Sequence, residues 1–270
     1  MRAGLALAFG LVVVAGAAAA DPVDRLLDAM QIDEVVNILV DEGSATALGL
    51  EERMFPGRGG AAWEDEVERI YERDAREAAL AADMRKRLEG EDLAPLLAFL
   101  ESDVGQRVMA LEVSARRAFV DPEMEEIALS LFADAEEEEP VLHGQVMEFV
   151  EVNDLVDQNV EGAFRANAAF ALGAHEAGAF PGMSLDALVA QLWGGDEAVE
   201  ADVSSWLYAY LMTAYRPLPE EDLAAYIDLS RTPSGQLLND VLMTSFGTLF
   251  TDISFDLGSA AGRFMAQQEL

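Results

Sequence analysis

The sequence has no cysteine, one lysine (Lys86) and only two histidines, His143 and His175, among its 270 residues. The lack of cysteine excludes disulfide bonds, thiol nucleophiles and thiolate metal ligands. His175-Glu176 has no second histidine four residues after the first, so the zinc-protease helix motif is absent. The Gly-x-Ser-x-Gly turn of serine hydrolases and the glycine-rich nucleotide loops are absent as well. We therefore predict no catalytic residue, no metal site and no cofactor.

Basic residues are scarce throughout the chain. There are 17 lysines and arginines against 51 aspartates and glutamates, which gives a net charge of −34. Such a surface repels nucleic acids and anionic membranes, because both are bound through cations that neutralise phosphates. We predict no nucleic-acid partner. Two interpretations of the acidic surface stay open, namely adaptation to an environment exposed to salt and recruitment of basic partners or divalent cations.

Long apolar runs are confined to residues 1–20. An arginine precedes the apolar segment Leu5–Val14, and the small residues Ala18-Ala19-Ala20 come directly before Asp21. This order is typical of a secretory signal peptide that is cleaved after Ala20. The alternative is an uncleaved anchor, although the segment is barely long enough to span a bilayer. The expected location is periplasmic or secreted, with no membrane span after cleavage.

Most of the remaining chain shows apolar residues three and four positions apart, the spacing of an amphipathic helix. A pattern from Val141 to Phe164 predicts one long helix. No segment alternates with period two for long enough to predict a strand. The predicted fold class is therefore all-α. The clearest helical stripe is Leu242, Phe246, Leu249, Phe250, Ile253, Leu257 and Phe264.

Several side chains within these predicted helices indicate local contacts. Glu112 and Arg116 stand four residues apart and predict an ion pair on a helix surface. Gly258 and Gly262 predict a close crossing of two helices. Buried amides that link helices, rather than a ligand site, are predicted for Asn153, Asn159 and Asn167.

The chain contains a sequence repeat. The matched segments are Glu91–Ala94 with Glu221–Ala224, Gly105-Gln106 with Gly235-Gln236, Trp63 with Trp193, and Phe55–Gly57 with Phe180–Gly182. The first three pairs lie 130 residues apart and the last lies 125 apart. We predict two tandem helical repeats, residues 21–135 and 141–270, packed into one body. The acidic run Glu136–Glu139 before Pro140 is predicted to be an exposed connector or a frayed helix end, and it lacks the spacing of a calcium loop.

Both copies of the repeat contain a glycine just after a predicted helix start. Thr232 and Pro233 form an N-cap and a first helical residue, and Ser102 takes the capping place in the first copy. Gly105 and Gly235 each cost about 1 kcal/mol of helix propensity relative to alanine. Close approach of the preceding helix explains both glycines. An anion held at the helix N-terminus is the alternative.

These motifs resemble those of the secreted bacterial family known as domain of unknown function 2059. The resemblance rests on Ser230–Gly235, with its Thr-Pro-x-Gly core, and on Leu111–Ala118 and Trp206–Tyr210, which look like stretches of two-copy members. It implies an exported helical protein of Gram-negative bacteria and no established reaction. The chain departs from the family pattern at Asp103, where proline is preferred, and in having glutamine after each glycine, where a basic residue is common.

Three classes of function remain open. We favour a non-catalytic interaction or scaffold module of the periplasm, for which a periplasmic protein is the expected partner. The second class is a binder of an apolar or peptide ligand in a groove between the repeats. The third is a hydrolase that uses two of the many carboxylates. Enzymatic activity therefore remains open, although the absence of any catalytic motif favours a protein without it.

Overall fold

The computed structural model describes residues 21–184, 187–188 and 196–266. Within these ranges the chain forms helices and no strand, which confirms the predicted all-α class. The predicted signal peptide, residues 1–20 with its cleavage site after Ala20, lies outside the described residues, as does Trp193 of the sequence repeat.

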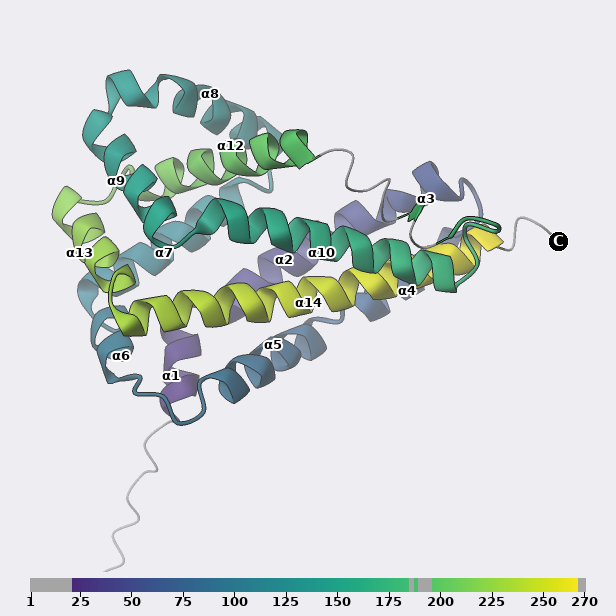
Figure 1. Ribbon diagram of the computed structural model, residues 1–270, viewed down its shortest axis with the longest axis horizontal. Helices are drawn as coiled ribbons and strands as arrows, with labels where there is room; N and C mark the ends of the chain where they lie inside the picture. Colours follow the sequence, from purple (N-terminus) through teal and green to yellow (C-terminus); the bar gives the residue numbers. More distant parts are fainter. Residues whose placement is uncertain (1–20, 185–186, 189–195, 267–270) are drawn as a thin grey trace, which may run out of the picture.

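Apart from the segment between α10 and α12, the helices follow one another with short connections (Figure 1). They are α1 (Pro22–Ala29), α2 (Ile32–Leu48), α3 (Leu50–Met54), α4 (Gly60–Ile70), α5 (Arg73–Arg87), α6 (Ala94–Leu100), α7 (Asp103–Ala118), α8 (Pro122–Glu138), α9 (Pro140–Val152), α10 (Leu155–Glu176), α12 (Asp196–Tyr215), α13 (Glu220–Ser230) and α14 (Pro233–Ala266). The helices α1, α8, α9 and α14 begin at a proline, whose missing N–H has no helical partner to lose in a first turn.

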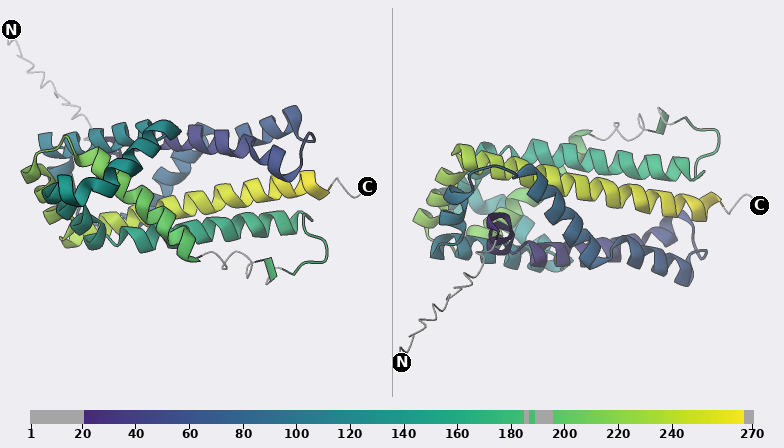
Figure 2. Two further views of the ribbon diagram at one scale, coloured as in Figure 1. Left: turned by 90° about the horizontal axis from the view of Figure 1, so that it is seen from above. Right: turned by 90° about the horizontal axis from the view of Figure 1, so that it is seen from below.

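The molecule is elongated and wider at one end. Figure 1 shows α6, α7, α8, α9, α12 and α13 at the wide end, while α3 and α4 lie at the narrow end beside the last turns of α10 and α14. The long helix α14 runs along the molecule next to α10, and both views in Figure 2 show these two helices side by side. The helix α14 also contacts α3, α4, α5 and α6, so it joins the C-terminal segment to the N-terminal one.

The predicted close crossing at Gly258 and Gly262 is confirmed, and the partner helix is α10. A methyl group on Gly258 would lie 2.0 Å from the carbonyl oxygen of Phe170, and one on Gly262 would lie 2.7 Å from that of Ala174. Only glycine fits at such distances, because backbone atoms cannot move aside as side-chain ends can. The two helices therefore pack backbone to backbone.

An aromatic cluster joins the last helix to the N-terminal part of the chain. The ring of Phe264 in α14 stacks on that of Phe55, with 5.2 Å between centroids, and meets Trp63 edge-on. Phe55 and Trp63 are fully buried, and the Trp63 indole N–H donates to the carbonyl of Ala47. Offset and edge-to-face aromatic pairs stabilise a core beyond the area that they bury.

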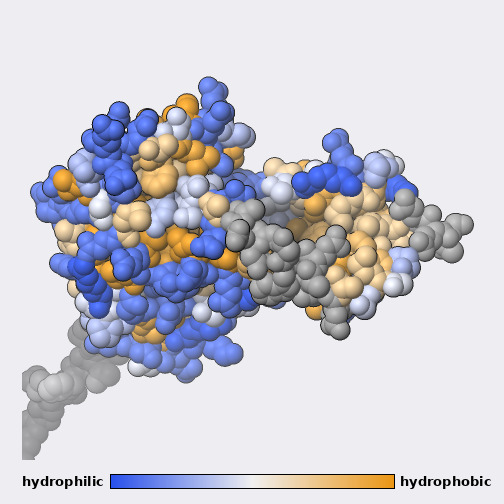
Figure 3. All heavy atoms as spheres, turned by 45° about the horizontal axis from the view of Figure 1, so that its top comes forward, coloured by the Kyte–Doolittle hydropathy of each residue, from blue (hydrophilic) through white to orange (hydrophobic). Residues whose placement is uncertain are grey.

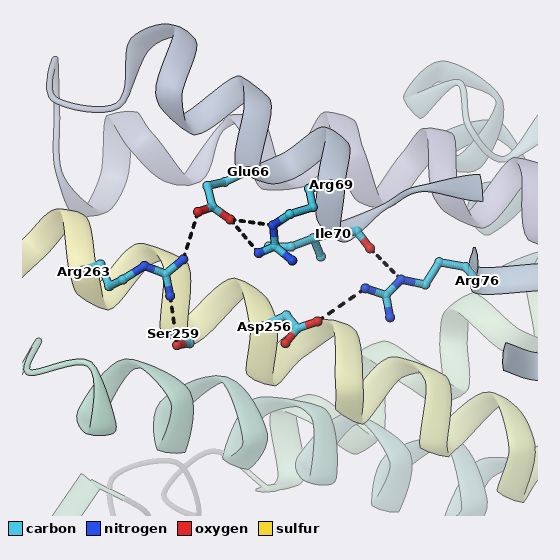
Figure 4. Close-up of polar contacts among 7 residues, drawn as sticks. All are labelled: Glu66, Arg69, Ile70, Arg76, Asp256, Ser259 and Arg263. Carbon is cyan, nitrogen blue, oxygen red and sulfur yellow. Dashed lines mark hydrogen bonds and ion pairs between the residues drawn. The ribbon is translucent and has the colours of Figure 1, made fainter. Parts of the chain in front are cut away.

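Polar contacts hold the same helices together at their surface (Figure 4). Arg263 of α14 donates to Glu66 of α4, whose carboxylate also accepts from Arg69. Arg76 of α5 donates to the carbonyl of Ile70 at the end of α4 and pairs with Asp256 of α14 at 3.3 Å. The bonds from Arg69, and then those from Arg263, lower the pKa of the Glu66 carboxyl group.

The prediction of a single long helix from Val141 to Phe164 is wrong. The helix breaks at Asn153, and Asp154 adopts a left-handed conformation with φ of 52° before α10 begins. Short polar residues such as aspartate tolerate this conformation better than most, so the apolar spacing runs across the break without revealing it.

The prediction that three asparagines are buried and link helices is confirmed for Asn153. Asn153 is 4% exposed; its amide donates to the carbonyl of Phe149, and its own carbonyl accepts from Asn239 of α14. Asn159 and Asn167 are exposed, so the prediction is wrong for both. The acidic run forms the end of α8, and Glu139 alone separates α8 from α9.

Candidate functional site

The corner between α6 and α7 has the same hydrogen bonds as the corner between α13 and α14. The Ser102 hydroxyl accepts from the Gly105 N–H at 3.1 Å, and the Thr232 hydroxyl accepts from the Gly235 N–H at 3.0 Å. Pro233 is the first residue of α14. Each hydroxyl also donates to the carbonyl oxygen three residues before it. One side chain thus caps the new helix and holds the end of the previous one.

Neither corner has room for a side chain at its glycine. A methyl group on Gly105 would lie 2.2 Å from the carbonyl oxygen of Phe99, and one on Gly235 would lie 2.1 Å from that of Leu229. The obstructing atoms are backbone atoms in both places. The N–H that a bound anion would need from each glycine is already bonded to the capping hydroxyl, so these contacts offer no support for an anion site.

The glutamine after each glycine completes the corner. The Gln106 side-chain amide donates to the carbonyls of Leu100 and Ala29, at 2.7 and 3.0 Å. The Gln236 amide donates in the same way to Ser230 and Val152, at 2.7 and 3.0 Å. Carbonyls at helix ends lack helical partners, and each amide satisfies two of them. The sequence identified these glutamines as part of the repeat and as departures from a family pattern, but it did not predict their contacts with the helix ends.

A second polar site lies between α7 and α12, and there the ion pair predicted for Glu112 and Arg116 is wrong. The Glu112 carboxylate accepts from the Tyr215 hydroxyl at 2.6 Å, and its backbone carbonyl accepts from Tyr210 at 3.1 Å. Arg116 instead forms a bidentate pair with Glu42 of α2 and lies over the Trp206 ring, 5.2 Å from its centroid. Both side chains contact α12, but the guanidinium of Arg116 pairs with α2 and the carboxylate of Glu112 bonds to α12, although they are one turn apart.

The Glu112 carboxyl group is enclosed by protein, although the residue as a whole is half-buried. Burial raises its pKa to about 7, and the hydrogen bond from Tyr215 offsets part of this rise. Burial also raises the pKa of Tyr215 well above its ordinary value, with the charge of Glu112 adding to the effect. Burial and the bond from Tyr215 account for the pKa of this carboxyl group, and no second carboxylate of the described residues contributes to it, so it does not form the pair that a glycosidase-like site requires.

An open groove runs along α2, facing α4 and the start of α5, with a volume of about 540 Å³. Its lining residues are Val40, Asp41, Ser44, Leu48, Glu64, Val67, Glu68, Tyr71, Glu72 and Arg73. We call it the acidic groove, because four carboxylates surround a partly apolar floor. Arg73 is its one cation, and it pairs with Asp41 at 2.7 Å. Glu112 does not line it.

An apolar stripe lies exposed on α8 and on the turn that precedes it. We define the α8 stripe as Val120, Met124, Ile127 and Leu131, which follow one another at intervals of four, three and four residues. Each is between 43 and 47% exposed. In Figure 3, which brings the top of Figure 1 forward, apolar residues lie among hydrophilic ones at the wide end of the molecule.

The face of α8 directly next to the stripe is packed against the molecule. Ala128 and Ala135 are buried, and the Phe132 ring stacks on Tyr208 of α12 with 5.4 Å between centroids. The helix is therefore held in place by one face, and the stripe is the edge of that face that remains exposed to solvent. The helix α8 contains seven carboxylates and no lysine or arginine.

The described parts of the chain contain no group of three histidine, aspartate or glutamate side chains placed to hold a metal ion. In the same parts, no helix is long and apolar enough to cross a membrane.

Comparison with known proteins identifies one similarity. Residues 77–134 match the model of a family described as an uncharacterized protein conserved in bacteria (DUF2059). The matched segment runs from α5 into α8, so it includes the first corner, Glu112 and the α8 stripe. No curated protein and no solved structure gives a significant match. The matched family is itself uncharacterized, so the similarity identifies no reaction.

Proposed function

We propose that this protein is a non-catalytic interaction module that acts after export from the cytoplasm. The observation that carries the proposal is the α8 stripe. Four large apolar side chains, each more than two-fifths exposed, lie on α8 and on the turn before it, next to the face by which α8 is packed. Contiguous exposed apolar surface on a folded protein is typical of a contact site for another macromolecule.

Export is proposed from the signal-peptide pattern of residues 1–20. The match to a bacterial family is compatible with it. A periplasmic or secreted location would give the α8 stripe access to partners outside the cytoplasm.

We further propose that the scaffold is a duplicated helical unit. The matching corners support this, because both Gln106 and Gln236 reach back to the end of a helix near the start of their own half. Those helices, α1 and α9, are each followed by a left-handed residue, Gln31 and Asp154. The contacts between the halves also correspond, because α5 packs on α14 as α12 packs on α7.

Site-specific photo-crosslinking in the native host tests the interaction role. A photoreactive amino acid at Ile127 is expected to give a discrete adduct with a second macromolecule, and the same group at exposed Glu89 is expected to give none. Adducts at neither Ile127 nor the acidic groove, with the protein present at its normal level, would contradict the proposal.

A second candidate function is binding of a peptide in the acidic groove. It is favoured by the groove's volume of about 540 Å³ and by its combination of apolar and acidic lining. Pockets that bind ligands usually combine such an apolar surface with a few polar groups. Leu48, which is 43% exposed in this groove, is the position at which a photoreactive group reports on this alternative.

A further inference from the structure

We propose that the α8 stripe docks an amphipathic α-helix of a partner protein, and that lysine or arginine flanks the apolar face of that helix. This inference rests on the proposed interaction function and specifies the chemistry of the partner. The partner is therefore expected to contact this one surface of the chain through a helix that carries basic residues.

The shape of the stripe favours a helix as the occupant. The intervals of three and four residues from Met124 to Leu131 place three side chains in a ridge along α8, roughly 10 Å long at the rise of a helix, and Val120 lies on the turn before it. Ridges of this kind pack into the grooves between the side-chain rows of another helix. In the described residues, nine large apolar side chains are exposed, and four of them belong to the α8 stripe.

Two of the four corresponding positions in the second half are covered, whereas Phe250, which stands 130 residues after Val120, is 40% exposed. Leu257 and Ala261 stand 130 residues after Ile127 and Leu131, and they are 7% and 0% exposed within α14. The helix α14 runs straight through this region, whereas Pro122 starts a new helix at the corresponding point of the first half. As a result, α8 packs on α12 and its ridge faces solvent.

Charge selects the class of partner. None of the seven carboxylates of α8 belongs to an ion pair with any described residue, while most arginines of the described chain are already paired elsewhere. Glu123 and Asp134 stand close to the ridge on one flank, and Glu136–Glu138 end the helix. Complementary charge steers association and disfavours wrong partners. A second copy of this chain would bring seven more carboxylates to the contact, and an anionic membrane would be repelled as well.

Peptide binding to the full-length chain tests this inference. The probe is a synthetic Leu/Lys amphipathic peptide about 18 residues long, roughly 27 Å as a helix. Its comparators are a scrambled peptide of the same composition and a Leu/Glu peptide with the same apolar face. Fluorescence anisotropy is expected to show binding of the Leu/Lys peptide alone, with an affinity that falls as salt is raised.

Matched variants locate the binding surface. The double variant Ile127→Ser and Leu131→Ser is expected to lower the affinity for the Leu/Lys peptide by about tenfold or more. Leu48→Ser in the acidic groove should leave the affinity unchanged. Glu123→Lys is expected to weaken binding more than Glu89→Lys, which reverses one exposed charge far along the chain from α8. Circular dichroism confirms that each variant is folded.

Each alternative occupant has its own outcome. Equal binding of the Leu/Glu or scrambled peptide overturns the basic-helix inference, but the interaction function stands if Ile127 still forms its crosslink. Loss of binding in Leu48→Ser alone assigns the peptide to the acidic groove and overturns the inference. A doubled mass in light scattering that Ile127→Ser abolishes would show that a second copy covers the stripe. Binding of phosphatidylglycerol vesicles through Ile127 would show a membrane instead.

Discussion

The hydroxyl of Tyr215 donates a hydrogen bond of 2.6 Å to the carboxylate of Glu112, which joins α12 to α7 inside the molecule. Tyr215 is 0% exposed, and burial raises the pKa of Glu112 from its ordinary value of 4.5 to about 7. The fold therefore contains a carboxyl group whose ionised form is disfavoured, although Tyr215 stabilises that form in part.

This group makes stability depend on pH. Between pH 4.5 and about 7, folded Glu112 retains a proton that the unfolded chain has released. The free energy of unfolding therefore falls as the pH rises through this window, by up to roughly 3 kcal/mol, and it stays low above the window. Glu112→Gln is expected to remove this part of the slope and to be more stable than the parent near pH 8. Urea unfolding, followed by tryptophan fluorescence at several pH values, measures the difference.

The control for this prediction is Tyr215→Phe, which removes the hydrogen bond and keeps the carboxyl group. Since that bond lowers the pKa of Glu112, its loss is expected to move the sloping region to higher pH. The general repulsion among the acidic residues affects both variants alike. Parallel stability curves for the parent and Glu112→Gln would show that Glu112 does not titrate in this range.

The corner glutamines give a prediction that needs no titration. Gln106→Leu or Gln236→Leu leaves two helix-end carbonyls without their donor. An unpaired buried polar group costs about 1–3 kcal/mol, so each variant should unfold at a lower urea concentration. Gln158→Leu is the matched control, because the Asn153 carbonyl that it frees still accepts from Asn239. A loss in the control as large as in the corner variants would contradict this account.

The helical class was predictable because apolar spacing is a local property of the sequence. The contacts of Glu112 were not, because Tyr215 lies 103 residues away and the rule for neighbouring turns considers one helix alone. The break at Asn153 was hidden for a different reason. It depends on the left-handed conformation of Asp154, while the apolar pattern continues across it.

The α8 stripe illustrates a further limit. The spacing of Val120, Met124, Ile127 and Leu131 is present in the sequence, and it is the same spacing that predicts a buried helix face. Only the burial of Ala128 and Ala135, where α8 packs on α12 and α9, shows which part of the apolar face is covered and which part remains exposed. The acidic groove was equally hidden, because its lining comes from three helices.

Export gives a prediction about the mature N-terminus. The small residues before Asp21 predict cleavage after Ala20, so intact-mass spectrometry of the exported protein should correspond to a chain that starts at Asp21. Replacing both Ala18 and Ala20 with leucine is expected to block cleavage and leave residues 1–20 attached. Recovery of the parent protein from membranes with Met1 intact would favour the uncleaved anchor.

The sharpest prediction concerns the two corner glycines. Gly105→Ala and Gly235→Ala place a methyl group 2.2 and 2.1 Å from a backbone carbonyl oxygen, so the corner must open to accept it. Overpacking of this kind costs about 1–3 kcal/mol, and we expect both variants to melt at a clearly lower temperature.

The control for the corner glycines is Gly162→Ala in α10, where a methyl group would meet nothing within 4 Å. There the gain in helix propensity should stabilise the chain by up to about 1 kcal/mol, so the same substitution changes stability in opposite directions at the two kinds of site.

Melts repeated with phosphate or sulfate separate packing from anion binding. If the corner held an anion, either ion would stabilise the parent and not Gly235→Ala. If packing is the reason for the glycines, the corner variants lose stability to the same extent with and without these ions, because the glycine N–H already donates to Ser102 or Thr232.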